Sequence, residues 1–137
     1  MKKRKPAKIA YRNCSPYGWW VASYIERFEW KSDDRSKPNR RCLAYENTIL
    51  IKAPDRESAY KKALGASNCL HAEWRSYGDK PPGRPGRWVF EGLTSFLAIH
   101  DELENGAEII WRIHGGRRVS TIKSLVKTKQ QLEAFID

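Results

Sequence analysis

The chain lacks any long apolar run. No stretch of about 18 consecutive apolar residues occurs, so no segment is expected to span a membrane. Residues 1–8 are basic, but no apolar segment follows them, so they are not expected to act as a secretion signal. Cysteine is scarce, and Cys14, Cys42 and Cys69 make an odd number without a CxxC pair. This pattern argues against a disulfide framework and favours reduced thiols in the cytoplasm.

Motifs that mark enzymes are also missing. The sequence has no Walker pattern and no dinucleotide-binding glycine pattern. Ser15, Ser95 and Ser120 lack the neighbours of an activated nucleophile, and the three histidines are scattered. We therefore expect a protein that is not an enzyme, with no catalytic residue, no cofactor and no bound metal ion.

Acidic side chains are few, 16 against 26 lysines and arginines, and the formal net charge is +10. The excess is uneven along the chain. Residues 1–41 carry 12 basic and 4 acidic side chains, residues 42–110 carry 8 and 10, and residues 111–137 carry 6 and 2. The positive charge thus gathers toward the two ends of the sequence. It favours attraction to polyanions, but does not by itself indicate a nucleic-acid ligand.

Alternating side chains predict two strands in the first half of the chain. The first covers residues 19–30, and places Arg27 and Glu29 on its solvent face. A polar loop over residues 31–41 precedes the second strand, residues 42–53. A hairpin is the simplest pairing of the two strands.

A helix near residues 55–64 is the clearest helical prediction, with proline and acids at its start and Gly65 at its end. Residues 71–77 are expected to form a third strand. Residues 78–86 hold three prolines and three glycines, which predicts a loop.

Residues 88–111 read as strand, helix and strand, and we expect them to organise the core, with Trp88 among its largest side chains. Leu93, Phe96 and Leu97 recur at helical spacing, which predicts a helix near residues 94–104. Ile109, Trp111 and Ile113 then alternate as in a strand. Residues 119–126 are ambiguous between strand and helix, and residues 128–136 are expected to form a last helix.

These elements predict an α+β protein: a mainly antiparallel sheet of four to five strands with two to three helices packed on it. Residues 1–18 are expected to be a basic, flexible N-terminal arm, and residues 19–137 a single domain.

Several segments resemble one known family. They are the opening Trp20-Val21-Ala22, the run from Glu46 to Ala53, the helical Glu57–Ala63, the run Trp88–Leu93, and the run Asp101–Ile109. Together they are similar to the bacterial domain-of-unknown-function family numbered 4288, over roughly residues 19–110. The resemblance departs in the basic first 18 residues and after Ile113. It implies the fold of that family, and no established activity comes with it.

One dense acidic cluster follows His100. It comprises Asp101, Glu102, Glu104 and Glu108. It could serve acid–base chemistry or bind a metal ion, but a charged helix end is the simpler reading, and a patch that meets a basic protein is the better functional one. Trp30 and Trp74 lie beside polar runs, so we expect them to be exposed and to anchor the same protein partner.

Three other candidate sites have simpler interpretations. Cys14, Cys42, Cys69 and His71 could form a zinc site, but their separations favour incidental cysteines. Residues 114–118 could bind an anion, although a plain glycine turn is the simpler reading. A nucleic-acid site would use aromatic rings beside basic side chains. Its candidates are Lys2, Lys3, Arg4, Lys5, Arg40, Arg41, Arg117 and Arg118.

The leading functional hypothesis is a small cytoplasmic protein that neutralises or regulates a protein partner, and bacterial immunity proteins against toxins are one such class. The alternative is a basic accessory protein that binds nucleic acid through residues 1–12, 35–41 and 112–129. The sequence does not indicate the oligomeric state.

Overall fold

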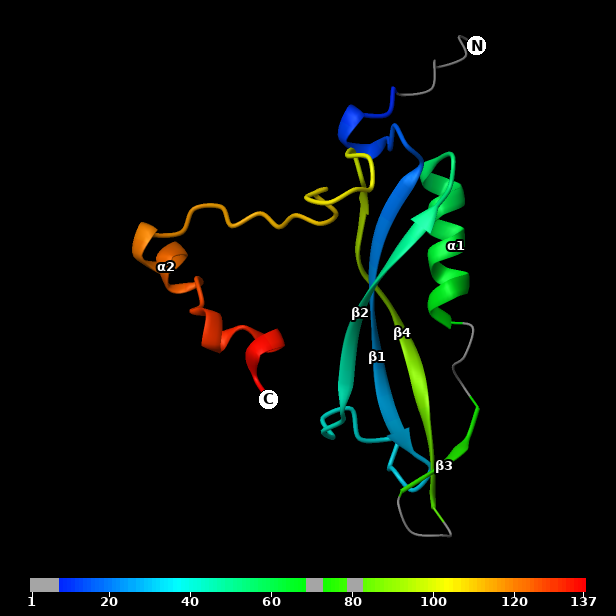
Figure 1. Cartoon of the computed structure of the whole chain (residues 1–137). Coiled ribbons are helices and arrows are strands. Elements are labelled where there is room, and N and C mark those ends of the chain that lie inside the picture. The colour runs from blue at the N-terminus through cyan, green and yellow to red at the C-terminus, as the bar shows by residue number, and fades with distance from the viewer. Residues whose placement is uncertain (1–7, 69–72, 79–82) are drawn as a thin grey trace.

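The computed structural model describes residues 8–68, 73–78 and 83–137, and it builds one antiparallel sheet (Figure 1). The strands are β1 (Trp19–Trp30), β2 (Ala44–Lys52), β3 (Arg75–Tyr77) and β4 (Arg84–Ala98), and the α-helices are α1 (Arg56–Asn68) and α2 (Val119–Ser124). Short 3-10 helices are η1 (Tyr11–Asn13), η2 (Lys129–Gln131) and η3 (Glu133–Phe135). The sheet order is β2-β1-β4-β3. The predicted antiparallel sheet is thus confirmed with four strands. The predicted third strand begins only at Arg75, and its first residues lie outside the described part.

The core lies between α1 and one face of the sheet. Ala59 and Ala63 are fully buried on the helix, and their small side chains let its backbone approach the strands. Trp20 stacks on Phe96 with ring centroids 5.5 Å apart, and the Trp20 indole N–H donates to the Ala53 carbonyl at 3.0 Å. This hydrogen bond ties the start of β1 to the segment that leads into α1.

The predicted helix near residues 94–104 is wrong, because β4 continues to Ala98 as one long strand. Two β-bulges interrupt its pairing with β1, and each inserts one extra residue into β4. Phe90, Leu93 and Phe96 therefore point to the same side of the sheet although they are three residues apart. Spacing of three residues imitates the period of a helix, and this explains the error.

Beyond the end of α1 the same face carries an aromatic cluster. The Phe28 ring meets Trp30, Tyr77 and Trp88 edge to face, at centroid distances of 4.7, 4.9 and 5.3 Å. Phe28 lies directly over Gly86, where an added Cβ would come within 2.3 Å of the ring. Trp88 is only partly buried, so the expectation that it is a central core residue is corrected in favour of Trp20.

Residues after Ala98 differ most from the sequence expectations. The predicted strand at residues 109–113 is wrong: these residues form no strand, and Ile113 is 79% exposed. The ambiguous segment contains the short helix α2, and the predicted helix at residues 128–136 consists of the two 3-10 turns η2 and η3. All three lie apart from the sheet in Figure 1, so of the described helices only α1 covers it. The strand that was expected here had no neighbour with which to pair.

The described part of the N-terminal arm is held against the end of the sheet. The Ser15 hydroxyl donates to the Ile99 carbonyl at 2.7 Å and accepts the Trp19 N–H at 2.9 Å. The Tyr11 ring lies 5.1 Å from the ring of His100. Residues 11–18 therefore form part of the domain's edge.

Candidate functional site

An arginine-rich hollow of about 430 Å³ lies where β1 ends and the following loop turns back toward β2. We call it the arginine pocket. It is lined by Arg27, Glu29, Arg35, Pro38, Arg40, Cys42 and Arg87.

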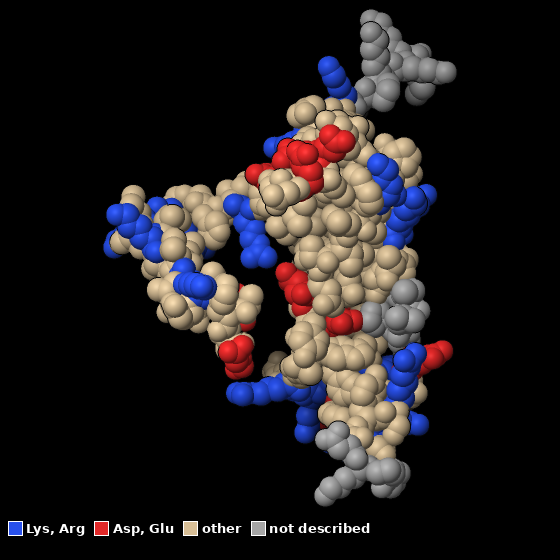
Figure 2. Space-filling view, in the orientation of Figure 1, with Lys and Arg blue, Asp and Glu red and all other residues tan. Residues whose placement is uncertain are grey.

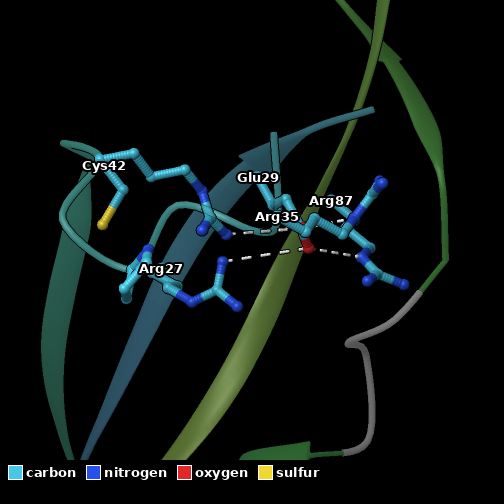
Figure 3. Close-up of a pocket in the computed structure, with 7 residues that line it drawn as sticks. Arg27, Glu29, Arg35, Cys42 and Arg87 are labelled. Atoms are coloured by element: carbon cyan, nitrogen blue, oxygen red, sulfur yellow. Dashed lines mark hydrogen bonds and ion pairs between the residues drawn. The ribbon is translucent and has the colours of Figure 1, made fainter. Parts of the chain in front are cut away.

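Sheet register and one loop bring these residues together. Arg27 and Glu29 are two residues apart on β1, so they share one face, which is the face away from α1. Arg87 on β4 is the direct register partner of Glu29. The loop between β1 and β2 then supplies Arg35 and Arg40. Figure 3 shows guanidinium groups from strands and loop directed at the Glu29 carboxylate.

Two side-chain hydrogen bonds fix the loop that carries Arg35. The Asp33 carboxylate accepts the Trp30 N–H at 2.8 Å, and the Asp34 carboxylate accepts the Ser36 N–H at 3.1 Å. The Ser36 bonds lower the pKa of Asp34, so its carboxylate stays ionised. The local sequence therefore shapes the turn that returns the loop to the sheet.

Glu29 is the centre of the pocket, and its side chain is only 2% exposed. Arg35 Nε lies 2.6 Å from Glu29 Oε1, and Arg87 Nε lies 3.0 Å from Glu29 Oε2. Burial by itself raises the pKa of Glu29, but the hydrogen bond and charge of Arg87, followed by those of Arg35, lower it further than burial raises it. Glu29 therefore stays ionised and holds the arginines together. The expectation that Glu29 lies on a solvent face is wrong.

Arg27 and Arg40 complete the pocket without making short bonds to Glu29. Each has a terminal guanidinium nitrogen 3.9 Å from that carboxylate. Arg27 Nε also binds Glu91 Oε1 at 2.6 Å, and Arg40 donates to the Lys37 carbonyl at 2.8 Å. Four guanidinium groups thus face two carboxylates, and a guanidinium has five N–H donors. The pocket retains positive charge and N–H donors for an anion.

Trp74 lies beside the pocket and supports two of its arginines. The guanidinium carbon of Arg87 is 4.4 Å from the centre of the Trp74 ring, and that of Arg35 is 5.1 Å from it. Trp30 similarly faces Arg84 at 4.2 Å. A guanidinium stacked on an indole keeps its N–H edge available for hydrogen bonds.

The acidic cluster lies in a loop that follows β4 at the other end of the sheet. We call residues 100–108 the acidic loop. The Asp101 carboxylate accepts the Glu108 N–H at 3.0 Å and closes the loop. Glu102 and Glu104 are exposed and border a shallow hollow of about 400 Å³. Figure 2 shows these acidic side chains gathered at the upper end of the molecule. No helix ends in this loop, so its charge comes from side chains alone.

The structure separates the residues predicted to bind one protein partner. The register pair Trp20–Ala98, next to the acidic loop, and the pair Glu29–Arg87 in the pocket are nine residue steps apart along β1. At about 3.3 Å per residue the two sites are about 30 Å apart. Trp30 and Trp74 lie at the arginine end, not beside the acidic loop, and both are partly buried, so the expectation that they are exposed is corrected.

The candidates for nucleic-acid binding are also dispersed. Arg40 lines the arginine pocket, and Arg41 lines an adjoining hollow together with Phe28 and Trp30. Arg117 and Arg118 lie far along the C-terminal segment, just before α2. Lys2, Lys3, Arg4 and Lys5 lie outside the described residues.

The structure also bears on the expectations about metal binding and about membrane-spanning segments. Over residues 8–68, 73–78 and 83–137, no group of three histidine, cysteine or acidic side chains is placed to hold a metal ion. Cys14 and Cys42 are both exposed free thiols, whereas Cys69 and His71 lie outside these ranges. Within the same part of the chain, no helix is long and apolar enough to cross a membrane.

Sequence reasoning missed Arg27, Glu29 and Arg87 as site residues, whereas Arg35 lies in the range 35–41 that it proposed for nucleic-acid binding. One signal was available: Arg27 and Glu29 lie at alternate positions of the strand, so two opposite charges fall side by side on one face. The partner Arg87 could not be found, because its register with Glu29 depends on two bulges that the sequence pattern does not disclose.

A four-stranded antiparallel sheet with one packed helix and an arginine pocket at one end defines a small α+β domain. Residues 19–111 match the model of a family described as Domain of unknown function (DUF4288). Because the match covers most of the chain, the protein belongs to this family. Comparisons with curated proteins and with solved structures gave no match.

Proposed function

We propose that this protein is a binding module whose arginine pocket holds an anionic partner, and that the partner is a nucleic acid. The observation that carries the proposal is the convergence of four guanidinium groups on one buried carboxylate, one of them stacked on Trp74, with a further arginine, Arg84, stacked on Trp30 beside them. Glu29 orders the arginines in the free protein, so less conformational entropy is lost when they bind a ligand.

Phosphate suits this pocket better than a monovalent anion. Arginine donates in a planar fork that matches two phosphate oxygens, and phosphate contacts account for much of nucleic-acid affinity. Trp30 and Trp74 are partly buried, and the accessible part of each ring adds a surface on which a base can stack. Single-stranded nucleic acid is the form we favour, because its bases are free to reach these rings.

The test is fluorescence anisotropy of a labelled single-stranded oligonucleotide, titrated with the full chain at several salt concentrations. Arg40→Ala is the informative variant, because Arg40 lines the pocket without a short bond to Glu29. It should weaken binding at every sequence tested, and reduce the salt slope by about 1 for one lost phosphate contact. The matched control is Lys61→Ala, which removes an exposed positive charge from α1. Equal effects of the two variants would refute a pocket-directed site.

A second candidate function rests on the acidic loop: neutralisation or regulation of a basic protein partner, as immunity proteins do for toxins. Its support is the exposed set of four acidic side chains at the end of the sheet opposite the arginine pocket. Exposed charge of this kind mainly accelerates association. Reversing Glu102 and Glu104 to lysine should preserve the fold and slow association with such a partner at low salt. An unchanged association rate would show that the acidic loop has no role in recognising the partner.

Both candidates are non-enzymatic, and both place the protein in the cytoplasm of a bacterium with its thiols reduced. A pull-down from the native host, with and without nuclease, discriminates between them. Partners that are lost after nuclease treatment support the nucleic-acid proposal, and a protein that is retained supports the second.

A further inference from the structure

The C-terminal segment passes over the sheet at Ile110 and Arg112, which line a hollow with residues of β1, β2 and β4, and then leaves it. Residues 113–118 run away from the sheet, and α2, η2 and η3 form a separate lobe (Figure 1). Every residue from Trp111 onward is exposed. A hollow of about 310 Å³ remains between Arg112 and Glu46 over the sheet, so the segment does not close onto its own domain even where it starts. We call residues 109–137 the C-terminal arm.

Apolar side chains recur in the arm at the spacing of a helix that packs on another element, but in this structure they are exposed. Ile122, Leu125 and Val126 follow i, i+3, i+4 spacing. Leu132, Phe135 and Ile136 repeat the same spacing. The exposed large apolar side chains of the arm are Ile109, Trp111, Ile113, Val119, Ile122, Leu125, Val126, Leu132, Phe135 and Ile136. Exposed large apolar side chains at this density mark an interaction site.

The domain carries a matching surface along β2. This strand is at the edge of the sheet, so its outer backbone groups pair with no strand of the described chain. Leu50 on β2 is about half exposed and lies on the face of the sheet away from α1, whereas Tyr45 lies on the opposite face. Glu46 is on the same face as Leu50 and adds an exposed negative charge to it. The arm is basic, with 6 lysines and arginines against 2 acidic residues over residues 111–137. Figure 2 shows acidic side chains on the side of the domain that faces the basic arm.

We propose that the arm docks on β2 of a second copy of the chain, and that two copies exchange arms reciprocally. One chain carries both complementary surfaces, and a twofold axis satisfies both at once. Reciprocal docking doubles the buried area, and a stable interface needs only about 800 Å² from each partner. Ten large apolar side chains in each arm can supply an area of that order. The inference does not depend on the anion-binding proposal, because β2 and the arm contribute no residue to the pocket.

The first test is the mass of the full chain by light scattering after gel filtration, over a wide range of concentration. We expect twice 15.9 kDa for the native chain. Leu125→Glu should reduce the mass to that of one chain, because it places a charge in the apolar stripe of the arm. Ser120→Glu is the matched control, since it adds the same charge to α2 outside that stripe and should leave the dimer intact. A native chain that is monomeric at every concentration would overturn the proposal, as would equal effects of the two variants.

The second test separates exchange between copies from docking within one chain. The native cysteines are first replaced by serine, and Leu50→Cys and Leu125→Cys are then placed on separate copies that carry tags of different mass. Oxidation should give a covalent species that contains both tags. When both cysteines are on one chain, a disulfide that forms only within that chain would overturn arm exchange. Circular dichroism of each variant confirms that the sheet is retained.

Discussion

Replacement of Glu29 by glutamine tests whether the buried carboxylate stabilises the arginine pocket. The variant keeps the size of the side chain but removes its charge and one of its two acceptor oxygens. Arg35 and Arg87 each donate to a different oxygen of Glu29, at 2.6 and 3.0 Å, so one of them would then face an amide N–H. Breaking a buried ion pair by removing one partner costs about 3–5 kcal/mol.

The expected loss is smaller here, because the arginines are partly exposed and regain contact with water. Arg35 is 47% exposed and Arg87 27% exposed. We therefore expect Glu29→Gln to lower the free energy of unfolding by about 2–3 kcal/mol, after discounting for solvent screening. The melting temperature should fall by about 3–5 °C per kcal/mol for a chain of this length. Urea denaturation at neutral pH, followed by circular dichroism, measures the difference.

The control is Glu46→Gln, which removes a charge from an exposed position on the neighbouring strand. This change should alter the free energy of unfolding by less than about 0.5 kcal/mol. If Glu29→Gln has an effect as small as this control, the carboxylate does not stabilise the pocket, and the reasoning is refuted.

The pH dependence provides an independent check. The pKa of Glu29 is lowered in the folded state, so its contribution to stability is present above its unfolded pKa and is lost as pH falls through the folded value. The native chain should therefore lose stability faster than Glu29→Gln below about pH 4.3. The difference in free energy of unfolding between the native chain and Glu29→Gln should become smaller in acid. A difference that does not change with pH would contradict the lowered pKa of Glu29.

Three further substitutions test the packing of the sheet by thermal or urea denaturation. Gly86→Ala should destabilise the protein by about 1–3 kcal/mol, because its Cβ would come within 2.3 Å of the Phe28 ring; a stability equal to that of the native chain would show that the ring moves freely. Ala63→Leu should cost about 1–3 kcal/mol by forcing α1 away from the sheet, and an unchanged melting temperature would place α1 elsewhere. Trp20→Phe should cost about 1–3 kcal/mol, because the Ala53 carbonyl loses its indole donor, whereas Trp111→Phe in the exposed arm should change little. Equal losses for the two tryptophan variants would be inconsistent with the burial described here.

Local chemistry determined the parts of the fold that depend on neighbours in sequence. Alternation over residues 19–30 specifies β1, and the small Ala59 and Ala63, four residues apart, specify the face of α1 that packs on the sheet. The acidic cluster was recognisable for the same reason, because its four charges lie within eight residues, although it was expected at the end of a helix and lies in a loop after β4.

Only the tertiary structure decided the rest. Two bulges in β4 place Phe90, Leu93 and Phe96 on one face, and no local pattern distinguishes this arrangement from a helix. The same bulges set the register that brings Arg87 to Glu29, 58 residues away in sequence. The arginine pocket therefore forms because β1 pairs with β4 and because the loop between β1 and β2 folds back over this pair. The sequence determined which side chains were charged, and long-range backbone hydrogen bonds determined which of those charges meet.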